Sequence, residues 1–264
     1  MTDASSTPAI PVTIHRGDYR PPEWQLPDIA LDFALGIDET RVTAALSVVR
    51  SADAPAPLTL RGDGLTALAV RVDGEGWNDW RMDGPDLIVD LGDRTAATVE
   101  VDIAIDPAAN TQLMGLYASN GMLCTQCEAE GFRRITFHPD RPDVLSRYKV
   151  RMAGDKALFP ILLSNGNCIA SGEGEGGRHW ALWEDPWPKP SYLFALVAGD
   201  LVVNRDEFVT LSGRKVELGI WVREGDVERT SHAMQALKNS MKWDEQVYGR
   251  EYDLDLFNIV AVSD

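Results

Sequence analysis

The sequence predicts a mainly β fold, in which a large antiparallel β-sandwich with a saddle-like form precedes a shorter segment of strands and one long helix. Apolar residues recur at every second position through much of the first 200 residues, which is the period of a half-buried strand. Turn-forming Asn-Gly pairs at 120–121 and 165–166 lie among these runs. No long helical pattern precedes residue 200. We therefore expect one β-domain of roughly 180 to 200 residues.

The first predicted element is a β-hairpin. Leu31, Phe33 and Leu35 are separated by single residues, and a second alternating run from Val42 to Val48 follows the turn residues Gly36–Glu39. Further strands are predicted at 58–60, 68–72, 87–91, 99–105, 149–152, 159–163, 167–170 and 178–183. Two connections are also predicted: a hairpin through Asn165-Gly166, and one or two helical turns at Pro142–Tyr148.

The last quarter of the chain changes character. The apolar run Tyr192–Ala198 is typical of a strand buried on both faces, and Gly199-Asp200 predicts a boundary after it. Beyond this boundary we expect strands at 208–211 and 216–221, a helix at about 227–248 ending at Gly249, and a strand at 254–262. The predicted organisation is a flexible arm at 1–17, an all-β domain at 18–200, and the beginning of a second domain at 201–264.

The composition excludes several classes of partner. Forty-one acidic against 25 basic residues give a net charge of −16, which repels phosphate backbones and anionic lipids. We therefore expect neither nucleic acid nor membrane partners, and no apolar run reaches the length of a membrane helix. Met1–Pro8 has neither the basic region nor the apolar core of a signal peptide. Three cysteines, an odd number, fit a reducing compartment, so we predict a cytoplasmic location.

The stretch Met114–Ile135 holds the strongest candidates for a binding site. The Asn-Gly turn predicts an extended segment from Leu123 onwards, which would present Gln126 and Glu128 on one face and Cys127 on the other. A carboxylate beside an amide suits a primary ammonium group. From the residues alone, one more solvated carboxylate is the commoner explanation of Glu128.

The same stretch carries a family resemblance. Gly115-Leu-Tyr-Ala-Ser119 followed by Cys124-Thr-Gln-Cys-Glu-Ala-Glu-Gly-Phe-Arg-Arg-Ile135 resembles the bacterial aminopeptidase N family of zinc metallopeptidases, close to its alanyl aminopeptidases. The similarity runs from about residue 18 to residue 264. The resemblance implies that Glu128 binds the α-ammonium of a peptide substrate with a free amino terminus, and that Gln126 lines the same pocket.

The resemblance also implies what this chain lacks. In that family the Gly-x-Met-Glu-Asn substrate loop and the His-Glu-x-x-His zinc helix of a thermolysin-like α+β catalytic domain follow the segment equivalent to Ile259–Val262. We therefore expect no catalytic residue and no zinc ligand here, no activity without the remainder of the catalytic domain, and zinc in the complete enzyme only. The alternative is a non-catalytic β-domain that binds peptide amino termini or a partner protein.

Other motifs have simpler explanations. The pair Cys124 and Cys127 could be half of a zinc site or a redox pair, but Cys168 and the four histidines offer no second pair at ligand spacing, which favours buried thiols. An aromatic cluster at 180–194 could bind sugars, although packing at the edge of a core is more usual. Arg133 and Arg134 are expected to pair with nearby acids, or to order the segment that carries Glu128.

Overall fold

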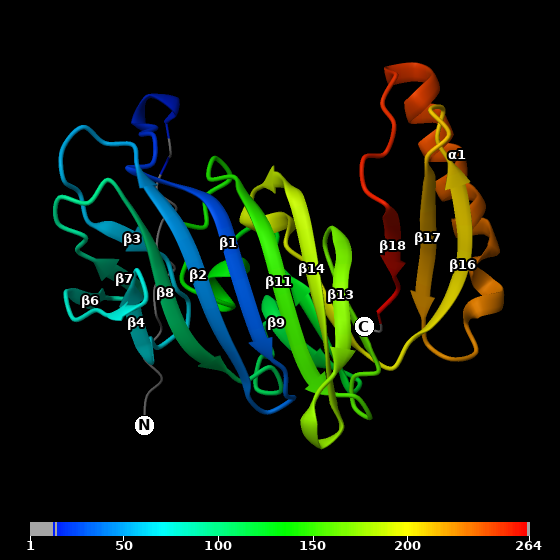
Figure 1. Cartoon of the computed structure of the whole chain (residues 1–264), viewed down its shortest axis with the longest axis horizontal. Helices are drawn as coiled ribbons and strands as arrows, with labels where there is room; N and C mark the ends of the chain where they lie inside the picture. The colour runs from blue at the N-terminus through cyan, green and yellow to red at the C-terminus, as the bar shows by residue number, and fades with distance from the viewer. Residues whose placement is uncertain (1–12, 14, 263–264) are drawn as a thin grey trace, which may run out of the picture.

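An eight-stranded sheet forms the largest layer of the structure, and two smaller sheets pack against the same core (Figure 1). The computed structural model describes residue 13 and residues 15–262, so most of the predicted amino-terminal arm lies outside the described residues. The large sheet has the order β13 (Asn167–Glu173), β14 (Arg178–Lys189), β11 (Ser146–Asp155), β1 (Trp24–Ala34), β2 (Thr40–Arg50), β8 (Ala96–Ile105), β4 (Ala69–Val72) and β5 (Glu75–Gly76).

The predicted first hairpin is confirmed as β1 and β2 at the centre of this sheet. Their inward residues are buried and paired across the ladder, as in Phe33 opposite Val42. The turn is closed by Thr40, whose hydroxyl donates to the Gly36 carbonyl oxygen at 2.8 Å. Alternation of period two therefore places one face of each strand in the core and leaves the other to solvent.

One predicted feature of the large sheet is only partly correct. β1 and β11 are parallel, with Leu31 opposite Val150, although the sandwich was predicted to be antiparallel. The chain leaves β1 through β2 and returns to its other edge only after about a hundred residues, a connection long enough to reverse direction. Both strands still bury alternate apolar residues, so the local pattern carried no signal of the pairing direction.

Two smaller sheets close the core on the opposite side. One has the order β12 (Ile161–Ser164), β15 (Leu196–Gly199), β10 (Met122–Gln126) and β9 (Gly115–Ser119). The other has the order β3 (Leu58–Leu60), β7 (Asp86–Val89) and β6 (Trp80–Asp83). Leu46 of the large sheet, Leu87 of β7 and Leu123 of β10 belong to one buried cluster, so β10 is anchored by its apolar side chains to the main core.

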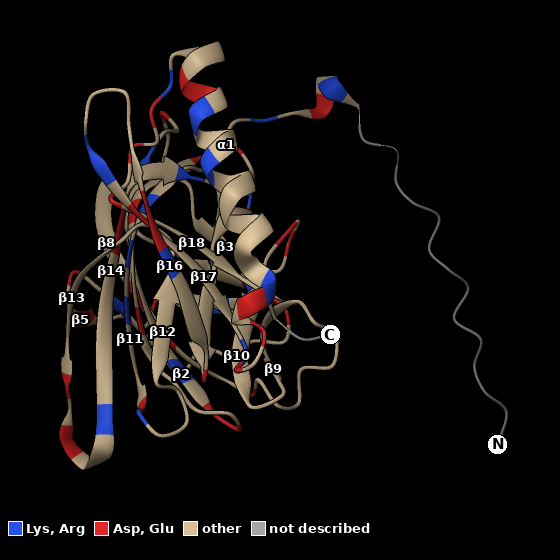
Figure 2. Cartoon of the chain, turned by 90° about the vertical axis from the view of Figure 1, so that its right-hand side faces the viewer, with Lys and Arg blue, Asp and Glu red and all other residues tan. Residues whose placement is uncertain are grey.

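The C-terminal segment forms a separate three-stranded sheet with a helix beside it (Figure 1). It comprises β16 (Val202–Val209), β17 (Lys215–Val222), α1 (Ser231–Tyr248) and β18 (Leu256–Val260). The predicted helix is confirmed, although its first turn, Val227–Thr230, is a 3-10 helix. Gly249 ends it in the left-handed conformation, with φ of 63°. Figure 2 shows both basic and acidic positions along the ribbon of α1, separated by uncharged ones. Met234 and Met241 pack the helix on β17.

Short 3-10 helices complete the secondary structure; besides the turn before α1 they are η1 (Arg16–Asp18), η2 (Phe132–Arg134), η3 (Glu175–Gly177) and η4 (Ser191–Leu193). One of them interrupts a predicted strand. η4 occupies the start of the run that was predicted to be one strand, so β15 begins only at Leu196. Pro142–Tyr148 forms a turn and then the start of β11, so the helical turns predicted there are wrong.

The hairpin predicted at Asn165-Gly166 is also wrong. β12 pairs with β15 in the four-stranded sheet, whereas β13 pairs with β14 in the large sheet. Asn165 is held on the β15 side, where its Oδ1 accepts the Ala195 backbone N–H at 2.7 Å. The Asn-Gly pair therefore carries the chain from one layer to the other instead of folding it back on itself.

We predict that Gly166→Ala destabilises the protein more than Gly213→Ala. Both glycines have positive φ, 84° and 88°, so both substitutions incur a left-handed backbone cost of about 1–2 kcal/mol. A Cβ at Gly166 would lie 2.1 Å from the Glu184 carbonyl oxygen, whereas one at Gly213 meets nothing within 4 Å. Urea unfolding should show an additional loss of at least about 2 kcal/mol for Gly166→Ala. Equal losses would contradict the close approach.

Candidate functional site

The candidate site lies where β10 ends. Gln126 is the last residue of the strand, Cys127 is buried, and Glu128 begins a turn. Gln126 and Glu128 are both exposed, as the alternation predicts, and the Gln126 side-chain amide donates to the Glu128 carbonyl oxygen at 3.2 Å. The strand ends at Gln126 and the chain turns from Glu128 onwards, so Glu128 lies just beyond the extended segment that was predicted to include it.

The turn after Glu128 is packed tightly against the strands beneath it. Gly131 donates its N–H to the Cys127 carbonyl oxygen at 2.8 Å, which closes the turn. A Cβ at Gly131 would lie 2.3 Å from the Gln126 carbonyl oxygen and 3.0 Å from the Gly115 nitrogen. Only glycine allows the turn to lie this close to β9 and β10.

Arginines fix the helix η2 that follows the turn. Arg133 Nε donates to Asp140 Oδ2 at 2.7 Å, and its Nη2 lies 3.1 Å from Glu130 Oε1. Arg134 donates to the Asp63 carboxylate at 2.5 Å. The expected pairing with nearby acids is therefore present for both arginines. Within the described residues Glu128, in contrast, has no ion-pair partner, so its carboxylate faces water.

Aromatic side chains of the core pack against Phe132 of η2. The Phe132 ring makes edge-on contacts with His138, Tyr148 and Phe194, with ring centroids 5.1, 6.1 and 5.2 Å away. All four side chains are buried. His138 Nδ1 accepts the Asp140 backbone N–H at 2.8 Å, so a neutral ring carries its proton on Nε2. Burial lowers the His138 pKa to about 4, and the negative charge of Asp140 acts in the opposite direction.

The two cysteines of the Cys-Thr-Gln-Cys motif are buried. Burial raises the pKa of both the Cys124 and the Cys127 thiol, which keeps them protonated and poor as nucleophiles or metal ligands. Cys168 is exposed and lies on β13, in another sheet. Within residues 15–262, no group of three or more His, Cys, Asp or Glu side chains is arranged to hold a metal ion. The residues described here therefore do not fit a zinc site.

The aromatic cluster is divided between core and surface. Trp183 is buried on β14 and donates its Nε1 proton to the Leu162 carbonyl oxygen at 3.2 Å. Phe194 is buried, whereas Trp187 is 51% exposed. These rings do not form one exposed platform, so the geometry gives no support to carbohydrate binding.

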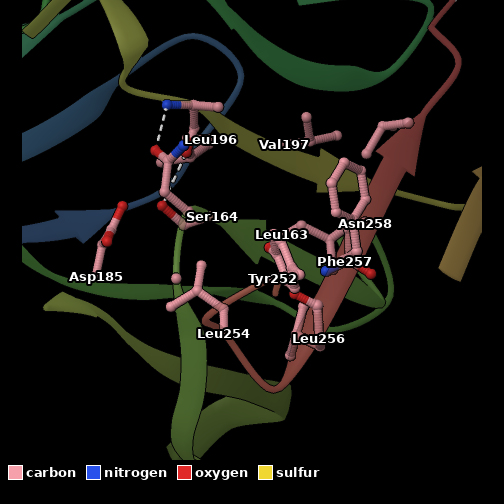
Figure 3. Close-up of a pocket in the computed structure, with 14 residues that line it drawn as sticks. Leu163, Ser164, Asp185, Leu196, Val197, Tyr252, Leu254, Leu256, Phe257 and Asn258 are labelled. Carbon is pink, nitrogen blue, oxygen red and sulfur yellow. Dashed lines mark hydrogen bonds between the residues drawn. The ribbon is translucent and has the colours of Figure 1, made fainter. Parts of the chain in front are cut away.

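A groove of about 220 Å³ separates β15 from the C-terminal sheet (Figure 3). Leu163 and Leu196 line one wall, and Leu256 and Phe257 line the other. Val197 of β15 lines the groove and pairs with Cys124 of β10. The groove and the candidate site therefore belong to neighbouring strands. Its walls are mainly apolar, and it brings no catalytic side chain to Glu128.

Comparison with known proteins identifies the region to which this site belongs. Residues 77–193 match the model of the Peptidase M1 N-terminal domain. Aminopeptidase N of Escherichia coli (strain K12) is 51% identical over 254 residues, which cover 96% of this chain and 29% of that protein. Aminopeptidase N of Caulobacter vibrioides (strain ATCC 19089 / CIP 103742 / CB 15) is 52% identical over 257 residues, with the same coverages. The chain represents the amino-terminal portion of the bacterial aminopeptidase N family.

Solved structures agree with this assignment. Legionella pneumophila aminopeptidase A in complex with aspartic acid superposes with a TM-score of 0.88 at 31% identity, covering 93% of this chain and 29% of that one. An M1 zinc metallopeptidase from Deinococcus radiodurans has a TM-score of 0.76 at 16% identity over 90% of this chain and 56% of its own, which shows a shared fold. The chain thus spans under a third of the length of the aminopeptidases N that it matches, members of a zinc peptidase family.

The sequence pointed to Gln126 and Glu128 as candidates but gave no sign of the buried polar groups near them. Asp140 and Ser191 are buried and polar, and neither stands in a periodic pattern or a recognisable motif. The one available signal was the presence of two adjacent arginines at 133 and 134, which predicted acidic partners without identifying them. Among the helices described in residues 15–262, none has the length and hydropathy required to cross a membrane.

We predict that His138 makes the protein sensitive to acid. The unfolded chain binds a proton at His138 near pH 6.5, whereas the folded protein resists it until about pH 4. The unfolded state therefore binds more protons in this window, and stability falls as pH falls through it, by about 3 kcal/mol from this group. His138→Gln should flatten the dependence of the unfolding free energy on pH between 6.5 and 4. The exposed His232→Gln is the control, and equal slopes in all three proteins would refute the assignment.

Proposed function

We propose that the chain is the amino-terminal part of a zinc-dependent aminopeptidase that releases single amino acids from peptide amino termini. The observation that carries this proposal is the exposed Glu128 carboxylate, which has no ion-pair partner in the described part of the chain and lies beside Gln126 at the end of a strand within the family match. A carboxylate with no protein partner is free to pair with the α-ammonium of a substrate. Such a contact measures the distance from the amino terminus to the bond to be cleaved.

The strength of this anchor depends on what covers it. Glu128 is exposed in the described structure, and an ion pair in water contributes little binding free energy. The same pair becomes stronger when water is excluded. We therefore assign full recognition of the ammonium to the complete enzyme, in which the remainder of the catalytic domain supplies the metal, the other binding residues and the cover.

The proposed organisation has an all-β domain at 18–200 and the beginning of the catalytic domain at 201–264. Two separate hydrophobic clusters support this division. One includes side chains from Trp24 to Leu201 together with Trp221, and the other is built on β16, β17 and α1. Trp243, Val247 and Tyr248 on the outer face of α1 are exposed, which suits a helix that packs against further protein.

Zinc belongs to the proposed complete enzyme and would be bound outside this chain. The proposed compartment is the cytoplasm, which three cysteines without a disulfide among the described residues support. The proposed partners are peptides with a free amino terminus.

The chain alone is expected to be inactive. Purified protein should contain no stoichiometric zinc and should not hydrolyse an alanine-linked chromogenic anilide, with or without added zinc, because the described residues offer no ligand set. Metal analysis by atomic emission and absorbance of the released aniline measure both outcomes. One zinc per chain together with turnover would contradict the assignment of the chemistry to another part of the enzyme.

In the complete enzyme, Glu128→Gln is expected to lower kcat/KM for this anilide by roughly 10- to 100-fold, the effect of losing a hydrogen bond to a charged group. Gln keeps the shape of the side chain and removes only the charge. Glu175→Gln, at an exposed carboxylate of η3 outside the contacts of Arg133, is the control. If both variants kept wild-type kinetics, Glu128 would not be the anchor, and a β-domain without catalytic function would become the better interpretation.

A further inference from the structure

The most deeply buried carboxylate near the candidate site is that of Asp140. Its side chain is 1% exposed, and it accepts hydrogen bonds from three donors. Oδ2 lies 2.7 Å from Arg133 Nε and 3.3 Å from the Arg133 backbone nitrogen, and Oδ1 lies 2.6 Å from Ser191 Oγ. The backbone N–H of Asp140 donates in turn to His138. This carboxylate is therefore fully engaged on the protein side and out of reach of a substrate.

Asp140 is joined to Glu128 through η2. Arg133 lies five residues after Glu128, and its guanidinium binds the Asp140 side chain and, through Nη2, the Asp140 carbonyl oxygen at 3.2 Å. The same guanidinium reaches Glu130 within the turn. Between them, Gly131 leaves no free space above Gln126. A displacement of Arg133 must therefore be transmitted to the turn that carries Glu128.

A second connection runs through η4 to the strand that ends at the site. Ser191 belongs to η4, which leads directly into β15. β15 pairs with β10, and there the Thr125 hydroxyl oxygen accepts the Leu196 backbone N–H at 2.8 Å. Thr125 immediately precedes Gln126. Asp140 thus ties together the two segments on either side of the strand end that presents Gln126 and Glu128.

Stability alone is a poor explanation of a charged group at this place. A buried ion pair loses the hydration of both partners, and apolar residues of similar volume are often as stable. What a directional, multiply bonded carboxylate contributes is a unique geometry. That property is needed where a second carboxylate has to be placed accurately relative to a bond to be cleaved.

We infer that Asp140 is a positioning residue, which sets the location of Glu128 by holding Arg133 of η2 and Ser191 of η4 in one buried network. This inference rests on the proposed function, in which Glu128 binds the substrate ammonium. Asp140 itself touches neither the substrate nor the metal. Its effect should therefore appear only for ligands that use the amine anchor.

The test compares two zinc-binding inhibitors on the complete enzyme. Alanine hydroxamate carries an α-ammonium, whereas propionohydroxamate has the same metal-binding group and lacks the amine. Asp140→Asn keeps the shape and can still accept from Ser191, but it directs an amide toward Arg133. We expect it to weaken inhibition by alanine hydroxamate about tenfold and to leave propionohydroxamate within about twofold, because a misplaced anchor affects only the ligand that contacts it. Asp143→Asn is the control, since this carboxylate of the same loop pairs with Arg141 and not with η2.

Each outcome has a distinct meaning. Equal weakening of both inhibitors by Asp140→Asn would show general damage and would overturn the inference, as would unchanged inhibition by both. Ser191→Ala keeps the Arg133 pair and is the second variant if Asp140→Asn does not fold; it should weaken alanine hydroxamate about threefold more than propionohydroxamate. Glu128→Gln separates the two hypotheses. If it leaves the ratio of the two inhibition constants unchanged, the proposed anchor fails, whereas a change with Glu128→Gln but none with Asp140→Asn or Ser191→Ala rejects only the positioning role.

Discussion

The position of β10 between β9 and β15 is the constraint on which the candidate site depends. Main-chain pairing on both sides fixes the strand, and Leu123 anchors it to the main core. The strand can then present Gln126 and Glu128 only at its end, where the chain turns away over Gly131. A site built on a paired strand is held more accurately than one on a free loop. The large sheet contributes indirectly, because it closes the core beneath β10.

The electrostatics of the site divide into a hydrated outer part and a dry inner part. Glu128 is exposed and without an ion-pair partner among the described residues, whereas Asp140 is buried and saturated with donors. These two carboxylates lie twelve residues apart in the sequence, and the burial of each suits a different task. An unsatisfied carboxylate is available to a cation, and a saturated one holds its donors in place. Both groups are carboxylates, so the two roles proposed for them rest on the difference in burial and in hydrogen-bond donors.

Much of the fold could be predicted from the sequence because alternation reports burial directly. The β1–β2 hairpin, the short strand β3 and the C-terminal helix with its final glycine follow from local period and turn chemistry. The direction of the β1–β11 pairing could not be predicted, since each strand shows the same alternation in either direction. The hairpin predicted at Asn165-Gly166 was wrong for a related reason. Gly166 has the positive φ that a tight turn requires, but the chain uses it to pass from one sheet to another. Only the long-range partners, Ala195 and Glu184, distinguish the two uses.

The candidate site shows the same limit more sharply. The alternation of Gln126, Cys127 and Glu128 about the strand axis is a local property and was predictable. The network beneath it joins residues 51 positions apart, as in Ser191 with Asp140, and no local pattern encodes such a contact. A candidate carboxylate can thus be picked out from its own segment, while the long-range contacts around it emerge only when the chain is folded. Under the proposed function, the division between an exposed carboxylate and buried supports has a physical purpose. The anchor must be placed before the substrate arrives, so its supports belong to the protein core, and they can be assembled without any contribution from the metal.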